Sequence, residues 1–219
     1  MATGDILGWL NSDDMHLPST LSFVADKVDL TDPGIYFGDC IHFFEDEDKL
    51  VSWGSDVTHR SRDCSLTNVD FIIQPSAFWS RKTWELVGPL RADLHYGFDW
   101  EWFLRAARRG AELRPINKAL SLYRTHASRK TATGGRSRQL ELLSIYREYD
   151  ERIARLYEML MDREPADVHS RTAMAARAAG KFLSMLGIPC REHDLTKFFN
   201  RKKYKDFSAK EIGECVEML

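Results

Sequence analysis

The sequence lacks the cysteine and histidine patterns that mark zinc sites and disulfide frameworks. Its four cysteines lie far apart with no CxxC pair, and its seven histidines include no HxH or HExxH spacing. These absences argue against a zinc site built wholly from protein ligands and against a disulfide-stapled fold. We expect reduced thiols and a cytoplasmic location.

Two further absences narrow the class of protein. No apolar run approaches the roughly 20 residues that a membrane-spanning helix requires, and no basic segment followed by an apolar core begins the chain. The formal net charge of −2 at pH 7 favours no nucleic-acid partner. With 219 residues, 43% of them hydrophobic and 29% charged, the chain has the composition of a globular protein with a real core.

Strand-like and helix-like segments are mixed over residues 1–131, which predicts an α/β domain with a mixed sheet flanked by helices. Asp5–Leu10 is short and mostly apolar, as expected of a strand buried on both faces. Residues 34–44 and 49–53 predict a hairpin, and Ser80 predicts a helix cap. The stretch "FDWEWFLRAARRG" predicts a helix that ends at Gly110.

Beyond Thr131 the pattern changes. Residues 132–139 have the composition of a linker, and apolar residues then recur at helical spacing, which predicts an all-helical region over residues 140–219. A second helix of this region should end near Gly187 and Pro189, and Ser208 with Glu211 forms a capping-box pattern. These residues show no chemistry of their own.

Asp13 and Asp14 are the first candidates for chemistry, because they follow the apolar strand directly. Adjacent carboxylates at a strand end suit a hard divalent cation, which takes oxygen ligands. The alternative is a turn followed by a helix cap, since Asn, Ser and Asp favour both places. On these residues alone the turn is the favoured interpretation.

Asp99 and Glu101 form a second candidate, at the start of a helix and among aromatic residues. Partial desolvation there would give a carboxylate the raised basicity that a general base needs, and the alternative is again a helix cap. His126 follows an apolar strand and is either a ligand or a surface residue. The tryptophans are mainly core material, with Trp79 and Trp102 as the expected site-lining exceptions.

The order of the motifs is more specific than any one of them. "ATGDILGWLNSDD", "YFGD", "FIIQPSAFWSRKTWELVGPL", "LHYGFDWEWFLRAARRG" and "LSLYRTHAS" follow one another between Ala2 and about Thr131. In this order they resemble the family 2 glycosyltransferases of the GT-A fold. The resemblance implies inverting transfer of a sugar from a nucleotide-diphosphate sugar to a hydroxyl of a glycan or other acceptor.

The resemblance also implies a role for individual residues. Asp13, with Asp14 beside it, would hold a divalent metal (Mn²⁺ or Mg²⁺) against the diphosphate, and Asn11 stands where many members have an aspartate. His126 falls where a late histidine approaches the metal, and Asp99 falls at the catalytic base, with Glu101 as its rival. The acceptor side would be formed by Gln74, Pro75, Ser76, Trp79 and Trp102.

Members of that family carry a nucleotide-binding half ahead of the acidic motif, whereas this sequence starts just before "GDI". We therefore expect a partial GT-A domain: another chain or a second copy supplies the missing strands, the sheet is rearranged, or the sequence is a fragment of a longer gene product. An apolar strand without neighbours would otherwise expose unpaired backbone. The alternative function is a non-catalytic remnant or binding module of a glycosyltransferase.

Overall fold

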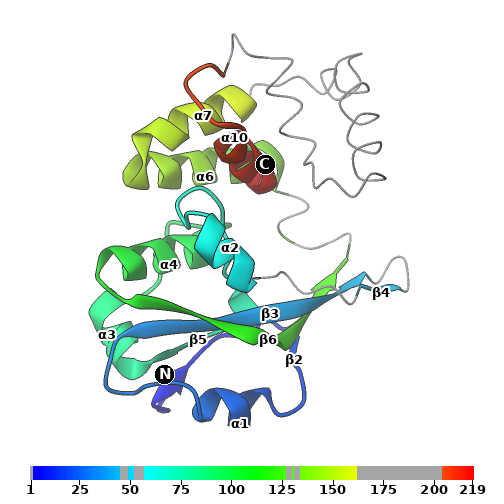
Figure 1. Ribbon diagram of the computed structural model, residues 1–219, viewed down its shortest axis with the longest axis vertical. Coiled ribbons are helices and arrows are strands. Elements are labelled where there is room, and N and C mark those ends of the chain that lie inside the picture. Colours follow the sequence, from blue (N-terminus) through cyan, green and yellow to red (C-terminus); the bar gives the residue numbers. More distant parts are fainter. Residues whose placement is uncertain (1, 45–48, 52–56, 127–129, 131–133, 162–203) are drawn as a thin grey trace. The chain divides into compact units, whose positions relative to one another are not determined.

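A computed structural model describes residues 2–44, 49–51, 57–126, 130, 134–161 and 204–219 (Figure 1). The chain divides into two compact units, one formed by residues 1–66 and 70–141, the other by residues 67–69 and 142–219. Within the described ranges, no helix is both long and apolar enough to cross a membrane.

The first unit is an α/β structure built on a mixed six-stranded sheet, as the sequence predicts. The strand order is β1-β5-β3-β6-β2, with β4 paired to β3 as well (Figure 1). Strands β3 and β6 run parallel, and the other pairs are antiparallel. The predicted hairpin is confirmed by the pairing of β3 with β4. The strands are β1 (Ile6–Leu7), β2 (Met15–His16), β3 (Gly34–Phe44), β4 (Lys49–Val51), β5 (Ala77–Ser80) and β6 (Glu112–Thr125).

Strand β1 differs from the prediction of a strand buried on both faces. It comprises Ile6–Leu7, lies at the edge of the sheet, and pairs with β5 and with no other described strand. Both of its residues are only half-buried. The apolar run does form a strand, but its edge position leaves one side without a neighbour, so apolar content alone misjudged its burial.

Strand β6 is the longest strand that the structure describes, with 14 residues. It runs from Glu112 to Thr125 alongside β3, and the register shifts on either side of Asp39. Such a shift is typical of a β-bulge, which lets a long pair of strands stay paired past a local irregularity.

Helix α3 begins where the sequence supplies a cap. Ser80 Oγ accepts a hydrogen bond from the Thr83 amide, which confirms the predicted cap. The helix predicted before Gly110 is also confirmed, and Gly110 has a φ of 89° that favours glycine. The helices of this part are α1 (Thr20–Ala25), α2 (Val57–Asp63), the 3-10 turn η2 (Gln74–Ser76), α3 (Arg81–Val87) and α4 (Phe98–Arg108).

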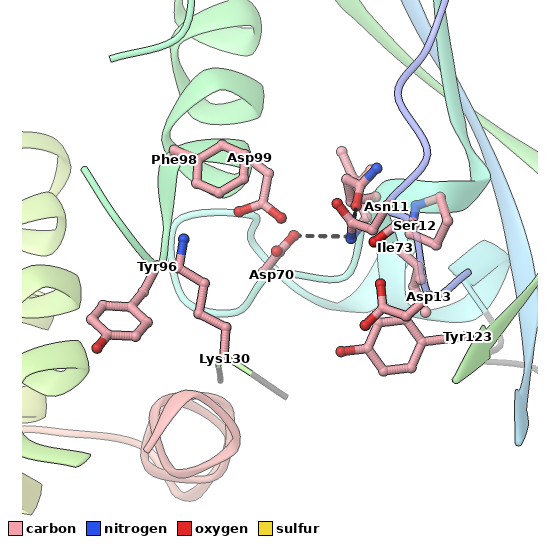
Figure 2. A pocket seen from close by; sticks show the side chains of 13 residues that line it. Asn11, Ser12, Asp13, Asp70, Ile73, Tyr96, Phe98, Asp99, Tyr123 and Lys130 are labelled. Carbon is pink, nitrogen blue, oxygen red and sulfur yellow. Dashed lines mark hydrogen bonds between the residues drawn. The ribbon is translucent and has the colours of Figure 1, made fainter. Parts of the chain in front are cut away.

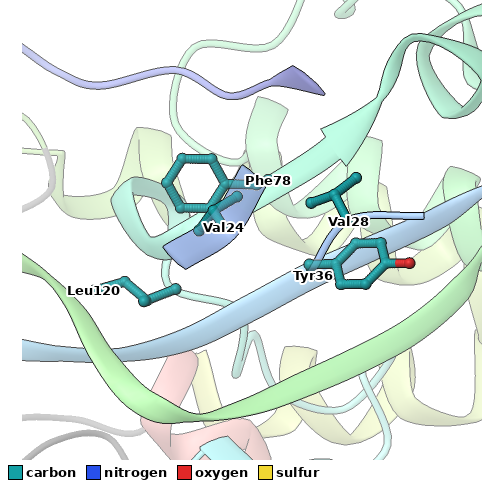
Figure 3. Close-up of a cluster of buried hydrophobic side chains, with 5 residues drawn as sticks. All are labelled: Val24, Val28, Tyr36, Phe78 and Leu120. Atoms are coloured by element: carbon teal, nitrogen blue, oxygen red, sulfur yellow. The ribbon is translucent and has the colours of Figure 1, made fainter. Parts of the chain in front are cut away.

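A cluster of buried apolar side chains fastens α1 to the sheet (Figure 3). It combines residues of α1 and the turn after it with residues of three strands, and the Thr20 hydroxyl also donates to the Leu120 carbonyl at 2.6 Å. Burying each large apolar side chain contributes about 1.5–3 kcal/mol. The members are Val24, Val28, Tyr36, Phe78 and Leu120.

The second unit is helical in the residues that the structure describes. Its elements are most of α6 (Gly135–Tyr149), then α7 (Glu151–Met161) and α10 (Ala209–Met218). The capping box of Ser208 and Glu211 is confirmed at the start of α10. The helix expected before Gly187 and Pro189 lies outside the described residues.

Helix α6 begins at Gly135, within the predicted linker of residues 132–139. Residues 135–139 form the first turn of α6, and the two units divide after Glu141. Two glycines and a serine gave this stretch a loop-like composition. Arg and Gln are nevertheless good helix formers, and they continue the helix from Gly135.

The close approach of β3 to β6 gives a testable prediction. A Cβ at Gly38 would collide with the Lys118 carbonyl oxygen and lie 2.8 Å from the Leu120 side chain. We expect Gly38→Ala to lower the free energy of unfolding by about 1–3 kcal/mol, the usual cost of overpacking. Urea unfolding measures it. Gly4→Ala is the control, because its Cβ would meet its nearest neighbour at 3.4 Å; equal losses in both variants would contradict the prediction.

Candidate functional site

A pocket of about 490 Å³ opens in the first unit where four segments converge (Figure 2). The turn after β1 forms one wall, and the segment leading into η2, the start of α4 and the end of β6 form the others. The lining residues are Asn11, Ser12, Asp13, Asp70, Ile72, Ile73, Gln74, Pro75, Tyr96, Phe98, Asp99, Tyr123 and Lys130.

Asp13 presents its carboxylate to this pocket, and His126 lies beside it. The Nε2 atom of His126 is 3.2 Å from Asp13 Oδ2, and the two side chains are 21% and 37% exposed. Asp13 comes from the turn before β2, whereas His126 directly follows β6. The structure thus brings together two predicted ligands that are far apart in the sequence.

Asp14, the predicted ligand beside Asp13, is not among the residues that line the pocket. Its side chain is buried, and its oxygens accept hydrogen bonds from the Arg124 amide and from Asn11 Nδ2, both at 3.2 Å. Burial raises the pKa of Asp14, and the charge of Asp13 raises it further. Asp14 therefore anchors the turn to β6, and of the two adjacent aspartates only Asp13 lines the pocket.

Asn11 connects two walls of the pocket. Its Nδ2 atom donates to Gln74 Oε1 at 2.8 Å, and Gln74 Nε2 donates in turn to the Trp9 carbonyl at 2.5 Å. The donor-side and acceptor-side segments that the sequence suggested are therefore hydrogen-bonded to each other. Pro75 lines the same wall as Gln74.

Asp13 and His126 together supply only part of the ligand shell that a hard divalent cation requires. Among the described residues, no group of three or more His, Cys, Asp or Glu side chains converges on one point. Mg²⁺ and Mn²⁺ sites commonly use one or two protein carboxylates and complete their shell with phosphate oxygens and water. One carboxylate with an adjacent imidazole is compatible with such a shared site.

Asp99 lies at the opposite wall, in the first turn of α4. Its Oδ1 atom accepts a hydrogen bond from the Trp100 amide at 2.9 Å. Burial raises the pKa of Asp99, while hydrogen bonds and the charges of Lys130 and Arg138 act in the opposite direction. A carboxylate with a raised pKa inside a pocket has the properties of a general base.

Glu101, the predicted rival, has a structural environment instead. Its side chain is 1% exposed, and both of its oxygens accept hydrogen bonds from Arg105, at 3.0 and 2.9 Å. Arg105 also donates to the carbonyls of Val87 and Pro89. Arg105 thus connects Glu101, in the same helix, to the end of α3. Glu101 is not among the residues that line the pocket.

Three other predicted site residues belong to the interior. Trp79 and Trp102 are fully buried with ring centroids 4.6 Å apart, and Trp9 packs against both. The Ser76 hydroxyl is within 2.8 Å of the Asp39 carbonyl and 2.5 Å of the Ser121 hydroxyl. The two predicted tryptophan rings pack within an aromatic cluster, and neither is among the residues that line the pocket.

The sequence patterns did not single out two carboxylates, Asp70 and Glu141, that have specific places in the structure. Asp70 lines the pocket, and its signal was a charged residue within the apolar run "NVDFIIQ". Glu141 accepts hydrogen bonds from the backbone amides of His95, Tyr96 and Gly97, at 2.6–2.8 Å. Because more than forty residues separate it from these partners, no local pattern could have indicated its role.

Comparison with known proteins adds no assignment: no family model matches the chain, and no curated protein is significantly similar to it.

The contacts of Glu141 give a second prediction. Glu141→Ala removes the acceptor of three successive amides before α4. We expect a loss of about 2 kcal/mol in the free energy of unfolding, as for hydrogen bonds to a charged group, and an intermediate loss for Glu141→Gln. Urea unfolding tests this against Glu85→Ala, an exposed glutamate of α3. A change in Glu141→Ala no larger than that in the control would refute it.

Proposed function

We propose that this chain is a glycosyltransferase of the GT-A type, which transfers a sugar from a nucleotide-diphosphate sugar to an acceptor hydroxyl with inversion. The observation that carries the proposal is the placement of Asp13 and Asp99 on the walls of one pocket (Figure 2). They come from two of the five motifs whose order suggested the family. The mixed α/β sheet is compatible with a partial GT-A domain.

On the donor side, Asp13 holds the divalent cation, with His126 beside it. When bound, Mn²⁺ or Mg²⁺ supplies positive charge that stabilises the leaving diphosphate. Asp14 and Asn11 keep the turn in place through the Arg124 amide and Gln74. A fixed turn means that the carboxylate of Asp13 needs little reorganisation when the donor binds.

On the acceptor side, Asp99 takes the proton of the acceptor hydroxyl. The oxygen forms a bond to the anomeric carbon while the bond from that carbon to the diphosphate oxygen breaks. Attack from the face opposite the leaving group inverts the anomeric centre. Gln74 and Pro75 form part of the wall against which the acceptor is positioned, so that the chain contributes mainly orientation and charge.

The proposal includes a further chain, or a second copy, that contributes nucleotide-binding strands. Its support is the position of β1, which ends the sheet and pairs with β5 alone among the described strands. An edge strand offers unpaired backbone groups to another strand.

A second candidate function is a binding module without catalysis. It is favoured by the hydrogen bonds that engage Asn11 and Asp14 inside the protein, which leave Asp13, with His126 beside it, as the metal donor that lines the pocket. Such a module would bind the acceptor glycan without requiring a nucleotide or a metal.

Metal-dependent nucleotide binding separates the two candidates. We expect UDP or GDP to bind the full chain in the presence of Mn²⁺, and Asp13→Ala to weaken that binding at least about tenfold, equivalent to about 1.4 kcal/mol. Isothermal titration calorimetry measures both. Asp32→Ala, an exposed loop aspartate, is the matched control. Absence of Mn²⁺-dependent nucleotide binding by the chain would exclude a stand-alone enzyme.

The base assignment has its own test. Asp99→Asn should reduce release of nucleoside diphosphate from a nucleotide sugar by about 10²–10⁴-fold, the usual contribution of a positioned base. Glu101→Gln should instead lower stability by about 3 kcal/mol, because it breaks a buried ion pair. Rates per folded molecule, measured well below the unfolding temperature, distinguish the two effects. If Asp99→Asn retains full transfer, Asp99 is not the base.

A further inference from the structure

Glu141 fixes the segment that leads into α4. The backbone amides of His95, Tyr96 and Gly97 donate to its two carboxylate oxygens at 2.8, 2.6 and 2.8 Å. Gly97 stands at the N-cap of α4 and makes no side-chain cap. In a capping box, a glutamate at the third helical position accepts the N-cap amide, but Trp100 stands at that position here. Glu141 takes this role from another helix, α6.

The segment held in this way carries one wall of the pocket (Figure 2). Tyr96 is one of the three anchored residues, and Phe98 and Asp99 follow them directly; all three line the pocket. Asp99 Oδ1 also accepts the Trp100 amide at 2.9 Å, within the first turn of α4. Because the anchored amides end two residues before Asp99, the anchor sets the direction from which the chain enters this turn.

Two further residues from the same part of the chain contact this wall. A Cβ at Gly134, directly before α6, would lie 2.8 Å from the Tyr96 ring, so the backbone of Gly134 lies close against that ring. The Nζ atom of Lys130, which also lines the pocket, is 5.9 Å from the ring centre of Tyr96 and 5.6 Å from that of Phe98. Lys130, Gly134 and Glu141 thus converge on Tyr96.

Glu141 supports the pocket without lining it, since it is not among the lining residues. Hydrogen bonds from amides to a carboxylate are shorter and stronger than those between neutral groups, so the wall needs little reorganisation when a ligand binds. The donor side is held by other contacts, in which Asn11 and Asp14 bind Gln74 and the Arg124 amide. Separate sets of hydrogen bonds therefore fix the two sides of the pocket.

We propose that Glu141 is a positioning residue that holds Tyr96 and Asp99 in place on the acceptor side of the pocket. The anchoring itself follows from the three hydrogen bonds, whereas its effect on sugar transfer rests on the proposed function. Glu141 touches no reacting atom and moves no proton. It acts through the backbone from which the base projects.

Amide hydrogen exchange, followed by NMR on the full chain, tests the anchor without any ligand. We expect the amides of residues 95–97 to be protected in the unmodified chain. Glu141→Ala should speed their exchange by at least about tenfold, as expected when hydrogen bonds to a charged acceptor are lost. The Trp100 amide should also exchange faster, because the Asp99 carboxylate that accepts its hydrogen bond loses its fixed orientation.

Two further variants complete the comparison. Glu141→Gln keeps the size of the side chain and one carbonyl acceptor, so exchange at residues 95–97 should rise less than in Glu141→Ala. Glu85→Ala removes an exposed glutamate of α3 and should leave these amides unchanged. The amides of β3 serve as the internal reference for global unfolding in every sample.

Each contrary outcome has a defined meaning. Unprotected amides at residues 95–97 in the unmodified chain would overturn the anchor, and this result does not depend on whether a variant folds. An equal acceleration in β3 would mean general destabilisation and would also overturn the proposal. Faster exchange at residues 95–97 with an unchanged Trp100 amide would overturn the positioning of Asp99.

Transfer assays separate this proposal from the proposed function. If the chain is active, Glu141→Ala should lower kcat for release of UDP from a UDP-sugar by about 10–100-fold, the effect of a small misplacement of a catalytic group. Binding of UDP with Mn²⁺ depends on the side of Asp13 and should change by less than about twofold. An unchanged kcat, or equal losses in both, would overturn the positioning role. The expected exchange pattern in a chain that binds no UDP with Mn²⁺ would support the anchor and count against a stand-alone transferase.

Discussion

The parallel pairing of β3 with β6 is the constraint on which the rest of the first unit depends. It aligns Gly34–Phe44 with Glu112–Thr125, and β5 and β2 attach to its two sides. Because β2 pairs with the end of β6, the turn before β2 is brought to the Arg124 amide and to His126. The position of Asp13 is therefore set by strand pairing rather than by its own neighbours in the sequence.

The acidic residues of this unit differ in role because they differ in partners. Asp14, Glu101 and Glu141 are each satisfied by specific donors: a backbone amide and an asparagine, an arginine, and three successive amides. Asp13, Asp70 and Asp99 line the pocket instead. Buried carboxylates must be paired or must shift their pKa, and this chain contains examples of both.

Much of the architecture could be predicted from local patterns. The cap at Ser80, the helix ending at Gly110 and the hairpin after β3 each depend on a few neighbouring residues, and each is confirmed. Strand β1 was predicted to be buried on both faces and is only half-buried at the sheet edge, and α6 begins at Gly135, within the predicted linker. Strand burial depends on the neighbours that a sheet supplies, and helix formation by polar residues depends on propensities that a loop-like composition conceals.

For the site, the sequence by itself determined which residue types were available: paired carboxylates after an apolar strand, a carboxylate opening an aromatic helix, and a histidine after a late strand. Only the tertiary structure decided which of them share a pocket. It placed Asp13 beside His126, and it buried Asp14, Glu101, Trp79 and Trp102. It also turned Asp70 toward Asp99 (Figure 2). Such pairings join residues far apart in the chain, and spacing cannot encode the packing and hydrogen-bond partners that separate a ligand from an anchor.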